Sequence, residues 1–251
     1  MKFLKRHPFA TVAHFDRVVA VSFAFPEAAL QPLLAKALEL DTYAGFGFVT
    51  VSMVWTSKLR PAAFPALAGQ DFFLAGYRIF TRLHEPGGRR LRGLQILRSE
   101  TDKLRMVWLG NLFTQYHYRR VRVRIAEENS ATRVQTFLPD GTPTLDLTFK
   151  PAGESAVLPN GSPFPDWKTA RRFAGPMPFS FSAEDERTMI VIEGSRQDWV
   201  PRPIEVERWA VSFFDETPLR GVTPILANAF AIEGVPYHWH RGRIVHTGGE
   251  A

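Results

Sequence analysis

Along most of the chain, apolar residues alternate with polar ones over short segments rich in Val, Ile and Phe. This alternation is typical of β-strands, because successive side chains on a strand point to opposite faces. Turn-forming clusters such as Glu-Pro-Gly-Gly at 85–88 separate the segments at intervals of about ten residues, as in antiparallel sheets. The pattern predicts strands at residues 17–25, 47–55, 72–83, 92–99, 104–109, 118–125, 132–138, 144–149, 188–193 and 203–214.

Helical patterns cover only three short segments, at residues 26–38, 166–173 and 224–230. The first begins with a proline and a glutamate, which suit the first turn of a helix, and the second begins with Asp166 as N-cap. Pro32 is expected to kink or shorten the first helix, because proline cannot donate a backbone hydrogen bond. The sequence therefore predicts a mainly β fold with a few short helices.

The length and composition are those of an ordinary globular protein. The 251 residues are 45% hydrophobic and 22% charged, and no internal repeat is visible. The stretch 151–166 is rich in Pro, Gly and Ser and is the one candidate linker, but strand patterning resumes beyond it without a shift in composition. We therefore expect residues 1–251 to form a single domain with a long loop at 151–166.

The net charge of +6 does not point to nucleic acid. Arg120, Arg122 and Arg124 alternate with apolar residues, as on a solvated sheet face, so we expect no nucleic-acid partner. No apolar stretch approaches the ~20 residues that a membrane-spanning helix needs, and no signal-peptide pattern follows the basic N-terminus. The absence of cysteine excludes disulfides and thiolate metal sites. These features predict a cytoplasmic protein that does not bind membranes.

Motifs that carry chemistry are scarce. There is no G-x-S-x-G motif, and the glycine-rich runs are not followed by helix starts, so they are not phosphate-binding loops. His238 and His240 would share one face of a strand and could bind a metal, but two ligands specify little, and we interpret them as surface histidines. Lys58, Lys103 and Lys150 resemble ordinary exposed lysines. We predict no metal site and no cofactor.

Arg78 is unusual because it lies within the apolar strand FFLAGYRIFTRL. If alternation turns it inward, its guanidinium must pair with a carboxylate, with carbonyl groups or with an anionic ligand. The alternative, a charge on the solvated face of the sheet, stays open at this point, since Arg82 lies on the same face nearer the strand end.

The segment RVVAVSFAFPEAALQPLLAKALELDTYAGFGFVTVSMVW resembles the opening of the YqjF-like proteins, an uncharacterised family related to acetoacetate decarboxylase. The residues that carry the resemblance are Pro26, Glu27, Leu30, Pro32, Leu33, Leu34, Leu38, Glu39, Asp41 and Gly45. Arg78 falls on the family's strand arginine. The resemblance is good over residues 15–125 and continues in segment order to about residue 245. It implies an antiparallel β-barrel or cone of the acetoacetate-decarboxylase-like type that encloses a small-molecule cavity.

The resemblance also implies that the decarboxylase chemistry is lost. Its relatives form a Schiff base through a lysine at the end of a Gly-Arg-x-x-x-Gly-x-Pro-Lys run, which corresponds here to GNLFTQYHY. Asn111 stands at the arginine position, His117 at the proline position and Tyr118 at the lysine position. The family's acidic residue falls on Leu74, and a further arginine falls near Ala24. If the protein is an enzyme, we therefore expect it not to be a Schiff-base decarboxylase.

The sequence leaves two functions open. The preferred one is a small-molecule-binding protein, or an enzyme, acting on an anionic carbonyl or carboxylate compound. Arg78 would hold the anionic group, Tyr118 and Asn111 would donate hydrogen bonds, and Tyr116 would point inward beside Tyr118 because alternate residues of a strand share a face. The alternative is a non-catalytic structural or interaction protein with a filled interior; a cavity above roughly 300 Å³ with converging polar groups would favour the first. Assembly of the protein into a homo-oligomer stays an open alternative.

Overall fold

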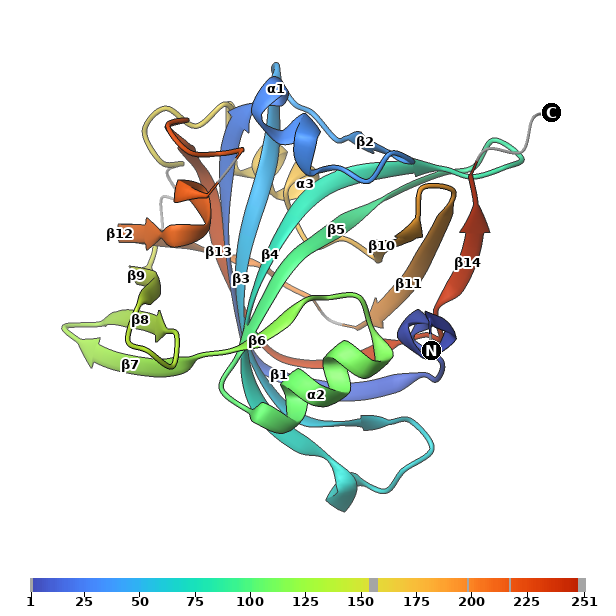
Figure 1. The fold of residues 1–251 in the computed structure, drawn as a ribbon. Coiled ribbons are helices and arrows are strands. Elements are labelled where there is room, and N and C mark those ends of the chain that lie inside the picture. Colours follow the sequence, from blue (N-terminus) through green and yellow to red (C-terminus); the bar gives the residue numbers. More distant parts are fainter. Residues whose placement is uncertain (1, 154–157, 198, 217, 248–251) are drawn as a thin grey trace.

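The computed structural model describes residues 2–153, 158–197, 199–216 and 218–247 and is dominated by strands (Figure 1). The strands are β1 (Thr11–Pro26), β2 (Leu38–Leu40), β3 (Phe46–Pro61), β4 (Gln70–His84), β5 (Arg90–Thr101), β6 (Tyr118–Arg120), β7 (Arg122–Glu128), β8 (Ala131–Phe137), β9 (Pro143–Pro151), β10 (Phe179–Asp185), β11 (Thr188–Arg196), β12 (Arg202–Val211), β13 (Ile225–Trp239) and β14 (Arg243–His246). The helices are α1 (Glu27–Leu30), α2 (Leu104–Phe113) and α3 (Trp167–Phe173), with 3-10 helices η1 (Lys2–Arg6), η2 (Gln31–Leu33), η3 (Ala66–Ala68) and η4 (Ser212–Asp215). The predicted mainly β class with few short helices is confirmed.

Seven of the described strands form a closed ring in the order β13, β1, β3, β4, β5, β10 and β11. The ring closes where Gly194 of β11 pairs with Trp239 of β13. All neighbours in the ring are antiparallel except β5 and β10, which are parallel. Closure leaves no unpaired edge within the ring and creates an inside and an outside face on every strand.

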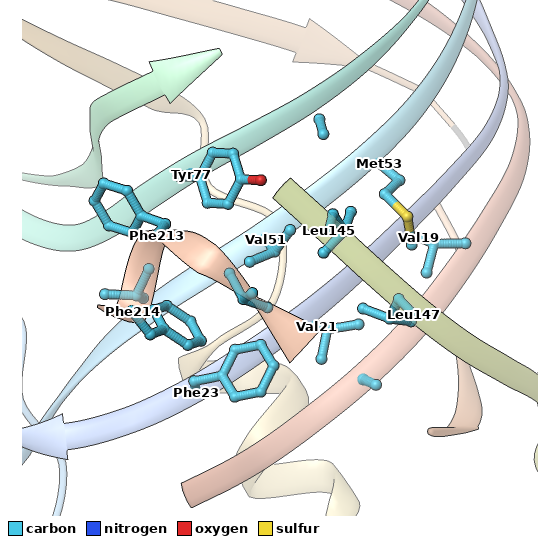
Figure 2. Close-up of a cluster of buried hydrophobic side chains, with 14 of the residues drawn as sticks. Val19, Val21, Phe23, Val51, Met53, Tyr77, Leu145, Leu147, Phe213 and Phe214 are labelled. Atoms are coloured by element: carbon cyan, nitrogen blue, oxygen red, sulfur yellow. The ribbon is translucent and has the colours of Figure 1, made fainter. Parts of the chain in front are cut away.

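The outside face of the ring is covered by a second group of strands, β12, β9, β8 and β7, which lies on the left in Figure 1. Alternate residues of β1 enter this interface, while the residues between them face the interior of the ring. Figure 2 shows the resulting outer core, to which β1, β3, β4, β9 and η4 contribute. Its labelled members are Val19, Val21, Phe23, Val51, Met53, Tyr77, Leu145, Leu147, Phe213 and Phe214.

One carboxylate is fully buried between the ring and the covering strands. Glu100 of β5 is 0% exposed and accepts hydrogen bonds from the Tyr77 hydroxyl at 3.2 Å and the Thr144 hydroxyl at 2.9 Å. Its charge is paired with the guanidinium of Arg119, whose Nε lies 2.9 Å from the carboxylate. A buried charge of this kind is tolerated because it has both a counter-ion and hydrogen-bond donors.

Two element predictions are wrong. Residues 104–109, predicted as a strand, belong to helix α2, and residues 225–230 of the helix predicted at 224–230 lie in strand β13. The run LRMVWL has apolar side chains on all sides, so its periodicity cannot distinguish a strand from a helix. Thirteen residues of β13 pair with residues of β1, and this pairing holds the segment extended in spite of the helix-start signal of Pro224.

Other boundaries differ in smaller ways. The helix predicted at 26–38 is shortened to α1 and η2, as expected from Pro32, and the strand predicted at 118–125 divides into β6 and β7. Asp166 caps α3 as predicted, because its carboxylate accepts a hydrogen bond from the Thr169 N–H at 2.7 Å. Residues 154–157 of the predicted loop lie outside the described residues. Among the described residues, no helix has the length and apolar character needed to cross a membrane.

Candidate functional site

The interior of the ring holds a cavity of about 520 Å³. Its floor consists of the inward-facing residues of β1, β3, β4 and β5, and α2 and the segment before β1 lie across one side. Neighbouring strands are in register across the floor: Ser52 of β3 lies opposite both Ala20 of β1 and Gly76 of β4. The cavity exceeds the size at which a binding function is favoured over a filled interior.

Arg78 of β4 faces this cavity. Leu74, Arg78 and Phe80 line it, whereas Ala75, Tyr77 and Ile79 between them belong to the outer core. The Nε of Arg78 is buried and has no hydrogen-bond partner among the described residues. Burial lowers the pKa of Arg78, and the polar groups that interact with it electrostatically are the phenols of three tyrosines. No aspartate or glutamate is found among the described residues that line the cavity.

Gly76 provides the room that the Arg78 side chain needs. A Cβ atom at Gly76 would lie 3.0 Å from the Arg78 Nε, tighter than nine in ten real contacts of a Cβ atom, so the Arg78 side chain would have to shift. The guanidinium therefore lies along the strand, over Gly76, and not straight out from the sheet. This orientation places the guanidinium beside Ser52 and Ser99, which flank Gly76 on the neighbouring strands.

Tyr116, Tyr118 and Tyr237 surround the guanidinium from other elements. The Tyr116 hydroxyl lies 2.8 Å from the Ser180 hydroxyl of β10, and the rings of Tyr116 and Tyr118 are 6.3 Å apart. Burial raises the pKa of Tyr116 to about 12 and raises the pKa values of Tyr118 and Tyr237 as well. All three phenols therefore keep their protons at neutral pH and can act as hydrogen-bond donors.

Asn111 does not line the cavity. Its amide donates a hydrogen bond to the Tyr118 carbonyl and accepts one from the Tyr118 N–H, both at 2.8 Å, so it fixes the backbone of Tyr118. His117 has a positive φ of 52°, which turns the chain between the two tyrosines. Both tyrosines line the cavity because of this turn, although only Tyr118 belongs to β6.

A row of polar residues crosses the sheet at the level of Arg78. Asn228, Ser22, Thr50 and Arg78 are successive partners on β13, β1, β3 and β4. Both amide atoms of Asn228 and the Ser22 hydroxyl are buried without a hydrogen-bond partner among the described residues. The interior of the ring is thus polar at this level, which is unusual for a protein core.

Sequence reasoning missed several residues of the site. Tyr237, Trp199 and Arg196 come from the last third of the chain, and only the closure between β11 and β13 brings them to β4. His7 lines the cavity ahead of β1, and burial lowers its pKa to about 4, so it is neutral at pH 7. The residues around His7 carried no motif that could have identified it.

The other residues singled out in the sequence lie outside the cavity. Lys103 pairs with Asp102 at 3.1 Å and Lys150 with Glu207 at 2.7 Å; neither they nor Lys58 are among the described lining residues. His238 and His240 lie side by side with ring centroids 4.5 Å apart. In the described part of the chain, no group of three or more potential metal ligands occurs.

Solved structures with the same arrangement of strands define the fold class. The chain is similar to an acetoacetate decarboxylase from Legionella pneumophila subsp. pneumophila str. Philadelphia 1 (TM-score 0.62, 9% identity, 95% of this chain and 88% of that chain). It is also similar to an acetoacetate decarboxylase-like enzyme from Sphingomonas wittichii RW1 (TM-score 0.58, 12% identity, 98% and 96%). A third is the enduracididine biosynthesis enzyme MppR complexed with pyruvate (TM-score 0.57, 9% identity, 94% and 90%). The fold is therefore acetoacetate-decarboxylase-like.

Within that fold class, residues 12–236 match the DUF2071 family, described as an uncharacterized conserved protein. The match covers most of the chain, so the protein belongs to this family. This result agrees with the resemblance, noted in the sequence, to an uncharacterised family related to acetoacetate decarboxylase. No match was found among curated proteins.

Proposed function

We propose that the protein binds a small organic carboxylate in the cavity of the ring, with Arg78 as the group that holds the anion. The observation that carries this proposal is the guanidinium of Arg78, which is largely buried, faces the cavity, and has no carboxylate partner among the described residues. A buried cation without a partner is costly, and an anionic ligand would supply the missing charge and acceptors.

The other arginines of the cavity do not have this property. Arg60 is half-buried and donates to the carbonyls of Lys58 and Phe64, each at 3.0 Å. Arg196 donates to the Pro176 carbonyl at 3.0 Å and stacks 4.5 Å above the ring of Trp199. Arg105 is exposed on α2. Arg78 is therefore the cation in the cavity that is best prepared to bind an anion.

The tyrosines add the hydrogen bonds that a carbonyl or carboxylate oxygen needs. The phenols of Tyr116 and Tyr118 face the same cavity as Arg78 and stay protonated at neutral pH. If the ligand is an oxo acid, the carboxylate on Arg78 would place its carbonyl near these donors, which could polarise it. Support comes from the similar fold of the MppR complex, which holds pyruvate.

The proposed chemistry does not use a Schiff base. Imine formation needs a neutral amine at the ligand, and Tyr118 occupies the position at which the family resemblance expects the lysine. The described lining residues include four arginines but no lysine. Binding and polarisation by hydrogen bonds therefore remain as the means by which these residues would act on a carbonyl compound.

Calorimetric titration of hexanoate into the wild-type protein, Arg78→Leu and Arg89→Leu tests the proposal. Arg89 is exposed, so its substitution changes the net charge equally without touching the cavity. Arg78→Leu should weaken hexanoate binding about 10- to 150-fold, since a charge-assisted hydrogen bond contributes about 1.5–3 kcal/mol. Arg89→Leu should bind like the wild type. Equal affinities for all three proteins would refute Arg78 as the anion site.

A further inference from the structure

Polar side chains of the cavity floor surround the Arg78 guanidinium, and an apolar stretch of floor lies next to them. Near the Arg78 guanidinium, Ser52 and Ser99 flank Gly76 in one row across the sheet. One step along the strands, the inward residues are Val54 with its partners Val18 and Leu74, and all three are apolar. The next step brings Thr56 between Phe15 and Phe72. Apart from the Thr56 hydroxyl, the floor is thus apolar over these two rows, before Arg60 and Gln70 line the cavity further along the strands.

The apolar part is long enough for an extended chain. Thr56 lies four positions beyond Ser52, which corresponds to about 13 Å along a strand. A saturated chain advances about 1.25 Å per carbon–carbon bond, so ten carbons span about 11 Å. The wall beside this part is also apolar, because Trp239 of β13 lines the cavity and packs against Phe15 with ring centroids 5.5 Å apart.

The volume argues against a small oxo acid as the whole ligand. A cavity of about 520 Å³ accommodates roughly 17 non-hydrogen atoms if each takes the space of one water molecule in the liquid, about 30 Å³. Pyruvate has six non-hydrogen atoms and would fill roughly a third of this space. An apolar ligand body in the remaining apolar space would increase the affinity, because its apolar surface is removed from water.

We infer that the ligand is an amphipathic monocarboxylate with an apolar body of about ten carbons. Its carboxylate lies against Arg78 and the tyrosines, and its body lies over Val54, Leu74 and Phe72. Entry past an apolar rim fits this class of ligand, because Phe64, beside η3, lines the cavity and is also 56% exposed. The inference rests on the proposed function, since it adds the apolar body to the carboxylate that Arg78 binds.

Titrations of acetate, butanoate, hexanoate, octanoate and decanoate, each below its micelle-forming concentration, test the inference. Affinity should rise about fourfold with each methylene, the ratio that corresponds to 0.8 kcal/mol of transfer free energy. Acetate and decanoate should therefore differ by several orders of magnitude. An affinity that stops rising at butanoate would overturn the inference.

A cavity-filling variant provides an independent measurement. Val54→Phe adds bulk over the apolar part of the floor, one row along the strands from Ser52, and should weaken decanoate binding at least tenfold while weakening binding of the shorter butanoate by a smaller factor. If this variant does not fold, as judged by its melting curve, the chain-length series decides alone. Equal losses for decanoate and butanoate in the folded variant would contradict the assigned position of the apolar body.

Comparison of decanoate with 1-decanol separates this inference from the proposed function. If both are correct, decanoate binds more tightly than 1-decanol to the wild type, and Arg78→Leu removes the difference. If carboxylates bind through Arg78 without any dependence on chain length, the proposed function stands and the present inference is refuted. If decanoate and 1-decanol bind equally to the wild type, the proposed function is refuted and the inference falls with it.

Discussion

Arg78 and Arg119 should respond in opposite ways to replacement by leucine. Arg119 is the counter-ion of the fully buried Glu100, whereas the Arg78 guanidinium has no carboxylate among the described residues. Arg119→Leu leaves a buried carboxylate with only hydroxyl partners, which costs about 3–5 kcal/mol. Arg78→Leu removes a charge whose pKa burial already lowers, so the free energy of unfolding should stay unchanged or rise.

Thermal unfolding of the ligand-free proteins measures the difference. For a domain of this length, 1 kcal/mol corresponds to about 2–4 °C, so Arg119→Leu should lower the Tm by about 6–20 °C. Arg78→Leu should melt within about 2 °C of the wild type or above it. A fall in Tm for Arg78→Leu as large as that for Arg119→Leu would show that Arg78 holds the fold together, and the argument for a ligand-binding arginine would fail.

Three further predictions concern the surroundings of the site. Gly110→Ala should destabilise the protein by about 1–3 kcal/mol in urea unfolding, because the new Cβ would overlap the Tyr118 ring, whereas Gly153→Ala, with open space around it, should have little effect. Burial lowers the pKa of His7 from 6.5 to about 4, so the unfolded state takes up a proton before the folded state does. The free energy of unfolding should therefore fall by about 3 kcal/mol through His7 as the pH falls from 6.5 to 4. In His7→Leu the free energy of unfolding should fall by that much less over the same pH range. Borohydride added with pyruvate or acetoacetate should leave every lysine unmodified in mass spectra, and a stoichiometric adduct on Lys58, Lys103 or Lys150 would contradict the lost Schiff base.

The ring could be predicted from the sequence where alternation is strong. β1, β3 and β4 are rich in Val, Ile and Phe, β5 alternates Leu and Ile with polar residues, and the four predicted segments lie within the observed strands. Helix α2 could not be predicted, because its Trp108 is 72% exposed while Met106 is buried, an apolar surface that no periodicity rule resolves. β13 was misassigned because its conformation depends on pairing with β1, about two hundred residues away in the chain.

Only part of the site could be predicted from the sequence, because some of its residues meet only through long-range strand pairing. Arg78 stood out as a charge inside an apolar strand, Tyr118 followed from the family resemblance, and Tyr116 followed from the alternation of side chains along a strand. Tyr237 could not be found, because it reaches the cavity only through the closure of the ring at β11 and β13. Asn111 was expected to donate to a ligand, whereas in the structure its amide bonds to the backbone of Tyr118.

The central claim, that Arg78 holds a carboxylate inside the ring, is tested most directly by a crystal structure with bound 4-bromobenzoate. The bromine can be located independently by its anomalous scattering, which fixes the orientation of the ring. The account predicts the carboxylate within hydrogen-bond distance of the Arg78 guanidinium and at least one of Tyr116 and Tyr118, with the bromine toward Val54 and Leu74. A carboxylate bound at Arg196 or Arg105, with Arg78 untouched, would contradict it.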